Sequence, residues 1–174
     1  MTEREVLAKR VFTASHLTGT FTLRSGTVSN EYFDKYLFEA DPGLLRDLAT
    51  AMAALVPKDS TALAGLELGG IPLATMCSQV LGLPTRFVRK QAKTYGTARL
   101  AEGGDLEGQR LCLIEDVVTS GGAVLDAAAE LRAQGAILGP VVCVIDREAG
   151  GRENLESVDL TLHALFTMTE LKAP

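Results

Sequence analysis

Two adjacent acids and the small-residue turn that follows them are the groups best placed to do chemistry. Glu115 and Asp116 follow the apolar run LCLI, and the turn VVTSGG then leads into a helix expected over residues 122–133. Unpaired N–H groups at a helix start carry the positive end of the dipole and bind phosphate, and the hydroxyls of Thr119 and Ser120 add donors. The acids can accept hydrogen bonds from vicinal hydroxyls, so the pattern predicts a ribose 5-phosphate site.

A simpler alternative is a solvated acidic strand end before a glycine-containing helix. An acid pair alone would favour that alternative, but the strand, acids, turn and helix in succession favour a ligand site. The chain contains neither G-x-x-x-x-G-K-[ST] nor G-x-G-x-x-G, so the segment is neither a Walker A loop nor a dinucleotide fingerprint.

The segment resembles the phosphoribosyl pyrophosphate (PRPP) signature of type I phosphoribosyltransferases, in which apolar residues precede two acids and a T-[ST]-G-G turn. The resemblance implies a PRPP site formed by the signature and by cations upstream of it. The implied PRPP-binding residues are Arg89, Lys90, Lys93, Glu115, Asp116, Val117, Val118, Thr119, Ser120, Gly121, Gly122 and Ala123. Of these, Lys93, Glu115 and Asp116 are the implied catalytic residues.

Three further segments resemble motifs of the orotate phosphoribosyltransferases. FTLRSGTVSNEYFDKYLF (21–38) resembles F-T-L-[KR]-S-G followed by an aromatic pair, RKQAKTYGT (89–97) resembles R-K-x-x-K-x-H-G, and VIDREAGGRENL (144–155) resembles D-R-x-x-G. Together with the PRPP signature they span nearly the whole chain in the family's order. The implied orotate-binding residues are Arg24, Tyr32, Phe33, Thr119 and Arg147.

Arg147 corresponds to the family's orotate-binding arginine, and its planar fork suits the carboxylate of orotate. The alternative is a surface ion pair of Arg147 with Asp146 or Glu148. Arg24 takes the position of a family lysine near the reacting ligands, so the charge is kept and the geometry changed.

A long polar stretch over 89–108 begins with three cations in five residues, Arg89, Lys90 and Lys93. A charge run is usually a solvated face, but departing pyrophosphate carries several negative charges that need stabilising. The resemblance implies that this flexible loop closes over the active site of the partner subunit in a homodimer. Tyr95 stands where the family motif has histidine.

The resemblance implies the reaction of orotate with PRPP to give orotidine 5′-phosphate and pyrophosphate, a step of pyrimidine (UMP) biosynthesis. Gly69 and Gly70 in GLELGGIPLA are expected to form a close-approach turn near pyrophosphate, although the lysine of the family's Y-K-G-I-P version is missing. Mg²⁺ is expected to travel with PRPP, without a direct protein ligand.

Two other functions would share part of this sequence pattern. A purine phosphoribosyltransferase would share the PRPP signature but should lack FTLRSG and the downstream D-R-x-x-G. A catalytically silent PRPP sensor on the same fold could lose the loop cations and would often need a basic DNA-binding element. The sequence favours neither rival.

The elements that must position these residues alternate between strand and helix. Helices are expected over 3–16, 41–56, 73–81 and 122–133, and strands over 21–24, 32–38, 61–68, 85–88, 110–115, 140–145 and 160–165. This rhythm predicts an α/β fold with a mostly parallel central sheet flanked by helices. The resemblance implies a single phosphoribosyltransferase domain over 1–174, with a small hood formed by about 1–38 and parts of 147–174.

Composition and net charge limit the domain size, the partners and the compartment that we expect. A chain of 174 residues with 47% hydrophobic residues can bury one sizeable core, and a net charge of −5 argues against nucleic-acid or anionic-membrane partners. The cysteines are far apart, so neither a disulfide framework nor a zinc site is expected, and Cys112 and Cys143 read as buried small hydrophobes. The absence of a signal-like or membrane-spanning run predicts a cytoplasmic protein.

Four ionisable residues, His16, Asp34, Lys35 and His163, lie outside these assignments. His16 and His163 lie outside the matched motifs, and we expect both to be structural or surface residues. Asp34 and Lys35 adjoin the aromatic pair, but solvent-facing charge is the simpler explanation for them.

Overall fold

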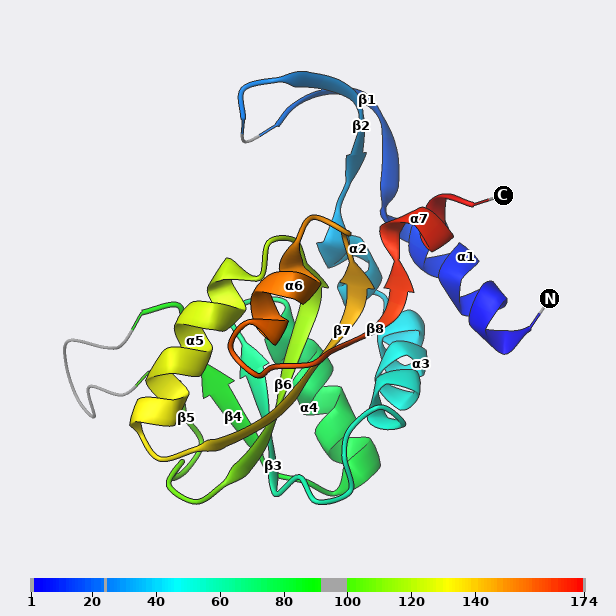
Figure 1. Cartoon of the computed structure of the whole chain (residues 1–174). Helices are drawn as coiled ribbons and strands as arrows, with labels where there is room; N and C mark the ends of the chain where they lie inside the picture. Colours follow the sequence, from blue (N-terminus) through cyan, green and yellow to red (C-terminus); the bar gives the residue numbers. More distant parts are fainter. Residues whose placement is uncertain (1, 24, 92–99, 174) are drawn as a thin grey trace.

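The computed structural model describes residues 2–23, 25–91 and 100–173 (Figure 1). In chain order the elements are α1 (Glu3–Ser15), β1 (His16–Thr22), β2 (Val28–Phe33), α2 (Lys35–Ala40), α3 (Pro42–Ala53), β3 (Ala62–Leu66), α4 (Gly70–Leu81), β4 (Thr85–Val88), β5 (Ala101–Glu102), β6 (Arg110–Val118), α5 (Gly122–Ala133), β7 (Ile137–Asp146), α6 (Gly151–Glu156), β8 (Leu162–Thr167) and α7 (Met168–Lys172). No helix in this described part has the length and apolar character needed to cross a membrane.

A central six-stranded sheet has the order β5-β4-β3-β6-β7-β8. Four of its strand pairs are parallel, with Leu63 opposite Cys112 and Leu113 opposite Val141, and only the short β5 runs antiparallel to β4. The predicted mostly parallel sheet is therefore confirmed. Because the strands are parallel, the carboxyl ends of β3, β6 and β7 meet at one edge, where open α/β sheets bind ligands.

Helices cover both faces of this sheet, α3 and α4 on one side and α5 and α6 on the other (Figure 1). Successive residues of β3 point to opposite faces. Leu63 belongs to a buried cluster with Leu48 of α3 and Leu73 of α4, whereas Ala64 belongs to the cluster that includes Leu131 of α5. Burial on both faces explains why the central strands are continuous apolar runs.

The hairpin of β1 and β2 forms a separate two-stranded sheet that projects away from the central one (Figure 1). Its antiparallel register pairs His16 with Phe33 and Thr22 with Val28. The base of the hairpin thus brings His16 beside the aromatic pair.

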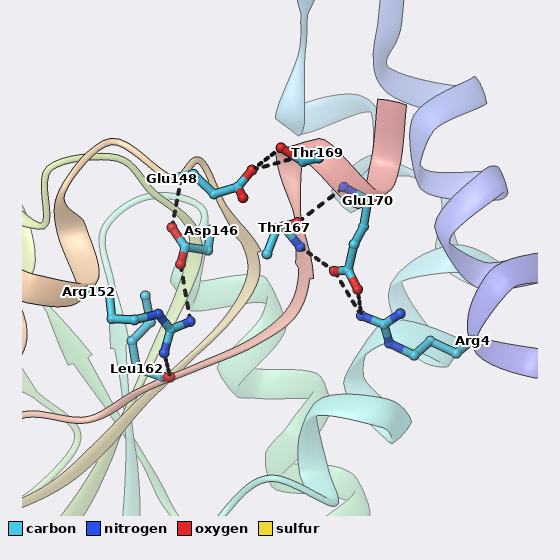
Figure 2. A network of polar contacts seen from close by, with 8 residues as sticks. All are labelled: Arg4, Asp146, Glu148, Arg152, Leu162, Thr167, Thr169 and Glu170. Atoms are coloured by element: carbon cyan, nitrogen blue, oxygen red, sulfur yellow. Dashed lines mark hydrogen bonds and ion pairs between the residues drawn. The ribbon is translucent and has the colours of Figure 1, made fainter. Parts of the chain in front are cut away.

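The two chain ends are joined by polar contacts (Figure 2). A guanidinium nitrogen of Arg4 in α1 donates to the carbonyl oxygen of Leu165 at 2.7 Å and lies 2.8 Å from Glu170 Oε1 in α7. Glu170 also accepts from the backbone N–H of Thr167 in a capping box, so one side chain starts α7 and holds α1 against it.

Several predicted elements are confirmed, two of them residue for residue. The strand over 85–88 and the helix over 122–133 have the predicted bounds. Asp41 caps α3 as expected, with Oδ1 accepting from the N–H of Leu44 at 2.7 Å and Pro42 at the first helical position. Local cap chemistry was therefore sufficient to place the start of this helix.

Other predictions were wrong in part. The strand expected over 32–38 ends at Phe33, because Asp34 accepts from the N–H of Tyr36 at 3.1 Å and caps α2. The long polar stretch contains the strand β5, and β6 continues through the acids to Val118 instead of ending at them. The short helices α6 and α7 were not predicted.

The burial expected for Cys112 and Cys143 is confirmed. Cys77, Cys112 and Cys143 are all buried and free. Burial raises the pKa of the Cys77 and Cys112 thiols to about 12, so these side chains act as small apolar groups.

Candidate active site

The acid pair lies within β6, where the strand reaches the ligand-binding edge of the sheet. Glu115 is 8% exposed and Asp116 is fully buried. The N–H of Asp116 donates to Glu115 Oε1 at 3.0 Å, and the N–H of Val117 donates to Asp116 Oδ1 at 2.6 Å. Both carboxylates are therefore fixed by the backbone of their own strand.

Lys35 compensates the charge of this pair. Its Nζ lies 2.6 Å from Asp116 Oδ2, so the expectation that Lys35 is a solvent-facing charge was wrong. Burial, followed by the charge of Asp116, raises the pKa of Glu115 well above its usual value. Burial also opposes ionisation of Asp116, but its hydrogen bonds with Glu115 and Lys35 prevail and lower the pKa of Asp116. The pair thus carries its negative charge chiefly on Asp116.

The glycine turn between β3 and α4 packs directly against the acids. A Cβ on Gly69 would lie 1.8 Å from Asp116 Oδ2, and one on Gly70 would lie 2.3 Å from the carbonyl oxygen of Ile114. No side chain fits at either position without displacing its neighbours. The turn predicted to approach pyrophosphate therefore lies next to the acid pair, and its role in binding stays a prediction.

The turn after β6 leaves the start of α5 free for a ligand. Gly121 has φ +80° and provides no side-chain cap. Thr119 and Ser120 are exposed, as are Gly122 and Ala123 at the helix start. Uncapped N–H groups at the start of a twelve-residue helix are suited to a phosphate.

Segment 150–156 packs against the backbone of this turn and holds it in place. Asn154 Nδ2 donates to the carbonyl oxygen of Ser120 at 2.9 Å. A Cβ on Gly151 would lie 2.5 Å from the carbonyl oxygen of Thr119, so only glycine allows α6 to approach this closely. The segment that resembles D-R-x-x-G (144–155) thus positions the turn after β6 as well as carrying Arg147.

A cavity of about 200 Å³ at the base of the hairpin brings together three of the predicted orotate residues, Tyr32, Phe33 and Arg147. Its other lining residues are His16, Leu23, Ser29, Glu31, Met168 and Lys172. Thr119 does not line this cavity, and Arg24 lies outside the described residues.

The alternative interpretation of Arg147, a surface ion pair, is wrong. Asp146 Oδ2 instead pairs with Arg152 at 3.2 Å, and Glu148 Oε2 accepts from the N–H and hydroxyl of Thr169 at 2.9 and 2.6 Å (Figure 2). Both neighbouring carboxylates are therefore occupied. Within the described chain the exposed guanidinium of Arg147 has no ion pair and is available to an anionic ligand.

The described loop cations lie at the carboxyl end of β4. Arg89 Nε is 3.7 Å from Glu102 Oε1, and the backbone N–H of Lys90 donates to Glu67 Oε2 at 3.1 Å. The side chain of Lys90 is exposed. The remaining predicted cation, Lys93, and Tyr95 lie outside the described residues.

Comparison with known proteins identifies the family. The phosphoribosyl transferase domain model matches residues 38–163. The orotate phosphoribosyltransferase of Nocardioides sp. is 53% identical over 173 residues, which are 99% of this chain and 97% of that protein. The chain belongs to the orotate phosphoribosyltransferase family. The Methanocella arvoryzae orotate phosphoribosyltransferase is 43% identical over 153 residues, covering 88% of this chain and 87% of the relative.

A solved structure of the same family shares the fold. The Mycobacterium tuberculosis orotate phosphoribosyltransferase in complex with PRPP aligns with a TM-score of 0.84 and 27% identity, covering 99% of this chain and 100% of that one. The type I phosphoribosyltransferase fold is therefore confirmed, and the family is that of orotate enzymes rather than of the purine enzymes or silent sensors considered as rivals.

His16 also lines the cavity at the base of the hairpin, a position that the sequence did not predict. His16 Nε2 lies 2.8 Å from Glu31 Oε2, and Lys172 Nζ lies 2.9 Å from Glu31 Oε1. Hydrogen bonds with Lys172 and then His16 lower the pKa of Glu31. The hairpin register, which pairs His16 with Phe33, was the signal that could have placed His16 beside the aromatic pair.

Proposed function

We propose that this chain transfers the 5-phosphoribosyl group from PRPP to orotate, giving orotidine 5′-phosphate and pyrophosphate in UMP biosynthesis. One observation carries the proposal: the N–H of Arg147 donates to the carbonyl oxygen of Val118 at 2.9 Å. This bond joins the segment that brings Arg147 to the aromatic cavity with the strand that leads into the phosphate turn. Orotate bound to Arg147 and the ribose of a PRPP molecule whose phosphate occupies the turn would therefore be neighbours, as phosphoribosyl transfer requires.

PRPP is proposed to bind along the turn and the acid pair. The free N–H groups at the start of α5 and the hydroxyls of Thr119 and Ser120 would bind the 5-phosphate. Glu115 and Asp116 would face the ribose hydroxyls. Positive charge grows on the ribose as its C1–oxygen bond breaks, and the negative charge of the acid pair would stabilise that state.

The leaving group and the acceptor are proposed to lie on opposite sides of C1. Orotate N1 attacks C1 and gives up its proton, while both electrons of the breaking C1–oxygen bond leave with pyrophosphate, whose oxygens can accept that proton. Arg89, Lys90 and Lys93 would stabilise the departing charge, and Arg147 would hold the orotate carboxylate against Tyr32 and Phe33. No covalent enzyme intermediate is required.

Mg²⁺ is proposed to arrive with PRPP as part of the substrate complex. Within the described residues, no group of three or more His, Cys, Asp or Glu side chains could hold a metal ion. The cation beside Asp116 is the ammonium of Lys35. Mg²⁺ that arrives with PRPP would neutralise charge on the leaving group.

The active assembly is proposed to be a cytoplasmic homodimer. The family resemblance supports a dimer in which the part of the stretch over 89–108 that precedes β5 closes over the partner's site. Three free, buried cysteines agree with a reducing compartment.

A substrate panel tests the proposed function. The protein is supplied with PRPP, Mg²⁺ and orotate, uracil, hypoxanthine or adenine, and pyrophosphate release is measured. Release should depend on orotate and exceed that with the other bases. Preference for a purine base, or no release with orotate, would overturn the proposal.

A further inference from the structure

A third carboxyl group is buried beside the acid pair and has no role in the reaction as derived above. Glu39 of α2 is only 8% exposed. Its Oε1 and Asp116 Oδ2 are both buried oxygens without a hydrogen-bond donor, although Asp116 Oδ2 has the ion pair with Lys35. A Cβ on Gly69 would lie 2.7 Å from Glu39 Oε1 and 1.8 Å from Asp116 Oδ2. The two oxygens therefore crowd the same glycine.

Two ionised carboxylates in this position would repel each other, and each would keep an unsatisfied buried oxygen. We propose that Glu39 and Asp116 share one proton, carried by Glu39, and that Glu39 and Lys35 act together as positioning residues for Asp116. Protonated Glu39 donates to the Asp116 carboxylate, so a single proton satisfies both oxygens. Lys35 then makes Asp116 the ionised member of the pair.

The charges around Glu39 agree with this arrangement. Burial, then the hydrogen bond and charge of Asp116, raise the pKa of Glu39 to about 9. The charge of Asp34 raises the pKa of Glu39 further, whereas the charge of Lys35 lowers it. Glu115 faces the same cluster and acts on Lys35 and Asp116. A neutral Glu39 and an ionised Asp116 are therefore the stable state at neutral pH.

The position of α2 indicates what the cluster of Lys35, Glu39 and Asp116 does. This helix starts two residues after Phe33, the end of the strand that carries the aromatic pair, and lies between the hairpin and the central sheet (Figure 1). Lys35 and Glu39 are one helical turn apart and both face Asp116. The cluster thus anchors the orotate-facing segment to the ribose-facing acid. The predicted effect of this cluster on turnover rests on the proposed function, whereas the shared proton between Glu39 and Asp116 does not.

The shared proton is tested by the pH dependence of stability in wild type, E39Q and the control E130Q. Glu130 is exposed on α5 and has no ion pair or hydrogen bond from its side chain within the described chain, so E130Q makes the same Glu-to-Gln substitution outside the cluster. A carboxyl group whose pKa is raised on folding stabilises the fold below its unfolded pKa, and this contribution is lost as pH rises toward its folded pKa. The thermal midpoint of wild type should therefore fall relative to E39Q from pH 5 to pH 9, while E130Q follows wild type.

Parallel midpoints of wild type and E39Q across this range would overturn the shared proton. If E39Q does not fold, E39M, which also cannot ionise and has a similar length, takes its place in the same comparison. The stability measurement needs no substrate, so it remains informative even if the proposed function fails.

The positioning role is tested by kinetics. K35M should raise the KM for PRPP by about tenfold, because Asp116 loses the cation that fixes its charge, while K35R should retain most of the affinity. In wild type, kcat/KM for PRPP should fall as pH rises through about 9, and E39Q should shift or remove that fall. An unchanged KM in K35M, or the same pH profile in E39Q as in wild type, would reject the positioning role.

Discussion

Asn154 Nδ2 donates to the carbonyl oxygen of Ser120 at 2.9 Å, so α6 is bonded to the turn that precedes α5. The same segment of chain bonds to the strand before that turn through the N–H of Arg147 and the carbonyl oxygen of Val118. The proposed orotate and phosphate sites therefore share one support. A substitution in α6 that displaces this turn should therefore weaken PRPP binding, even though the substituted residue touches no substrate.

Gly151→Ala tests this support. The new Cβ would lie 2.5 Å from the carbonyl oxygen of Thr119 and 2.6 Å from Val118 Cγ1, so the turn must shift. We expect the KM for PRPP to rise by about an order of magnitude, as misplacement of binding groups commonly causes. Gly43→Ala is the matched control at another helix start, because its Cβ would meet only Asp41 Oδ1 at 3.4 Å. Equal kinetics for the two variants would contradict the prediction.

Arg147→Ala should raise the KM for orotate by about tenfold to a hundredfold, the usual range for losing a hydrogen bond to a charged group. The guanidinium has no ion pair within the described chain, so the thermal midpoint should stay close to that of wild type. Arg152→Ala provides the contrast, since Arg152 donates to the carbonyl oxygen of Leu162 at 2.8 Å and pairs with Asp146. That variant should lose thermal stability. An unchanged KM for orotate in Arg147→Ala rejects the assignment.

The sequence was sufficient for features that depend on neighbouring residues. The apolar run before Glu115, the small residues of the turn and the cap at Asp41 are local signals, and the structure has the expected elements at each. The ligand-binding edge followed from the parallel sheet alone, because every such strand ends at the same side.

The parts that the sequence did not predict depend on contacts between distant residues. Lys35 looked like a solvent-facing charge because its partner, Asp116, is on β6 of the central sheet, far from α2 in the sequence. His16 looked peripheral because only the hairpin register brings it to Phe33. The strand predicted over 32–38 failed for a local reason, since the cap formed by Asp34 outweighed the aromatic residues that follow it.

The cysteines should resist modification in the native protein. Burial raises the pKa of Cys77 and Cys112 to about 12 and raises that of Cys143 as well, so thiolate is scarce at pH 8. A disulfide reagent at pH 8 should label no thiol in the folded protein and all three after denaturation. Rapid labelling of any one thiol under native conditions would contradict the burial of that side chain.

Lys93→Ala tests the loop cations. Lys93 lies outside the described residues, and its role comes from the match of RKQAKTYGT to the family loop. Its loss should lower kcat by orders of magnitude, because a preorganised cation at a departing anion contributes mainly in the transition state. Circular dichroism and thermal midpoint should stay like those of wild type. Near-normal turnover would reject the role of Lys93.

A mixture of Lys93→Ala and Arg147→Ala tests whether the loop acts on the partner subunit. If it does, a mixed dimer has one site with Arg147 from one chain and Lys93 from the other, and that site is complete. After denaturation and joint refolding, random pairing in a two-fold dimer should restore about a quarter of wild-type activity at low orotate concentration. Each variant refolded alone is the control. Activity no higher than the average of those controls would mean that each loop serves its own subunit.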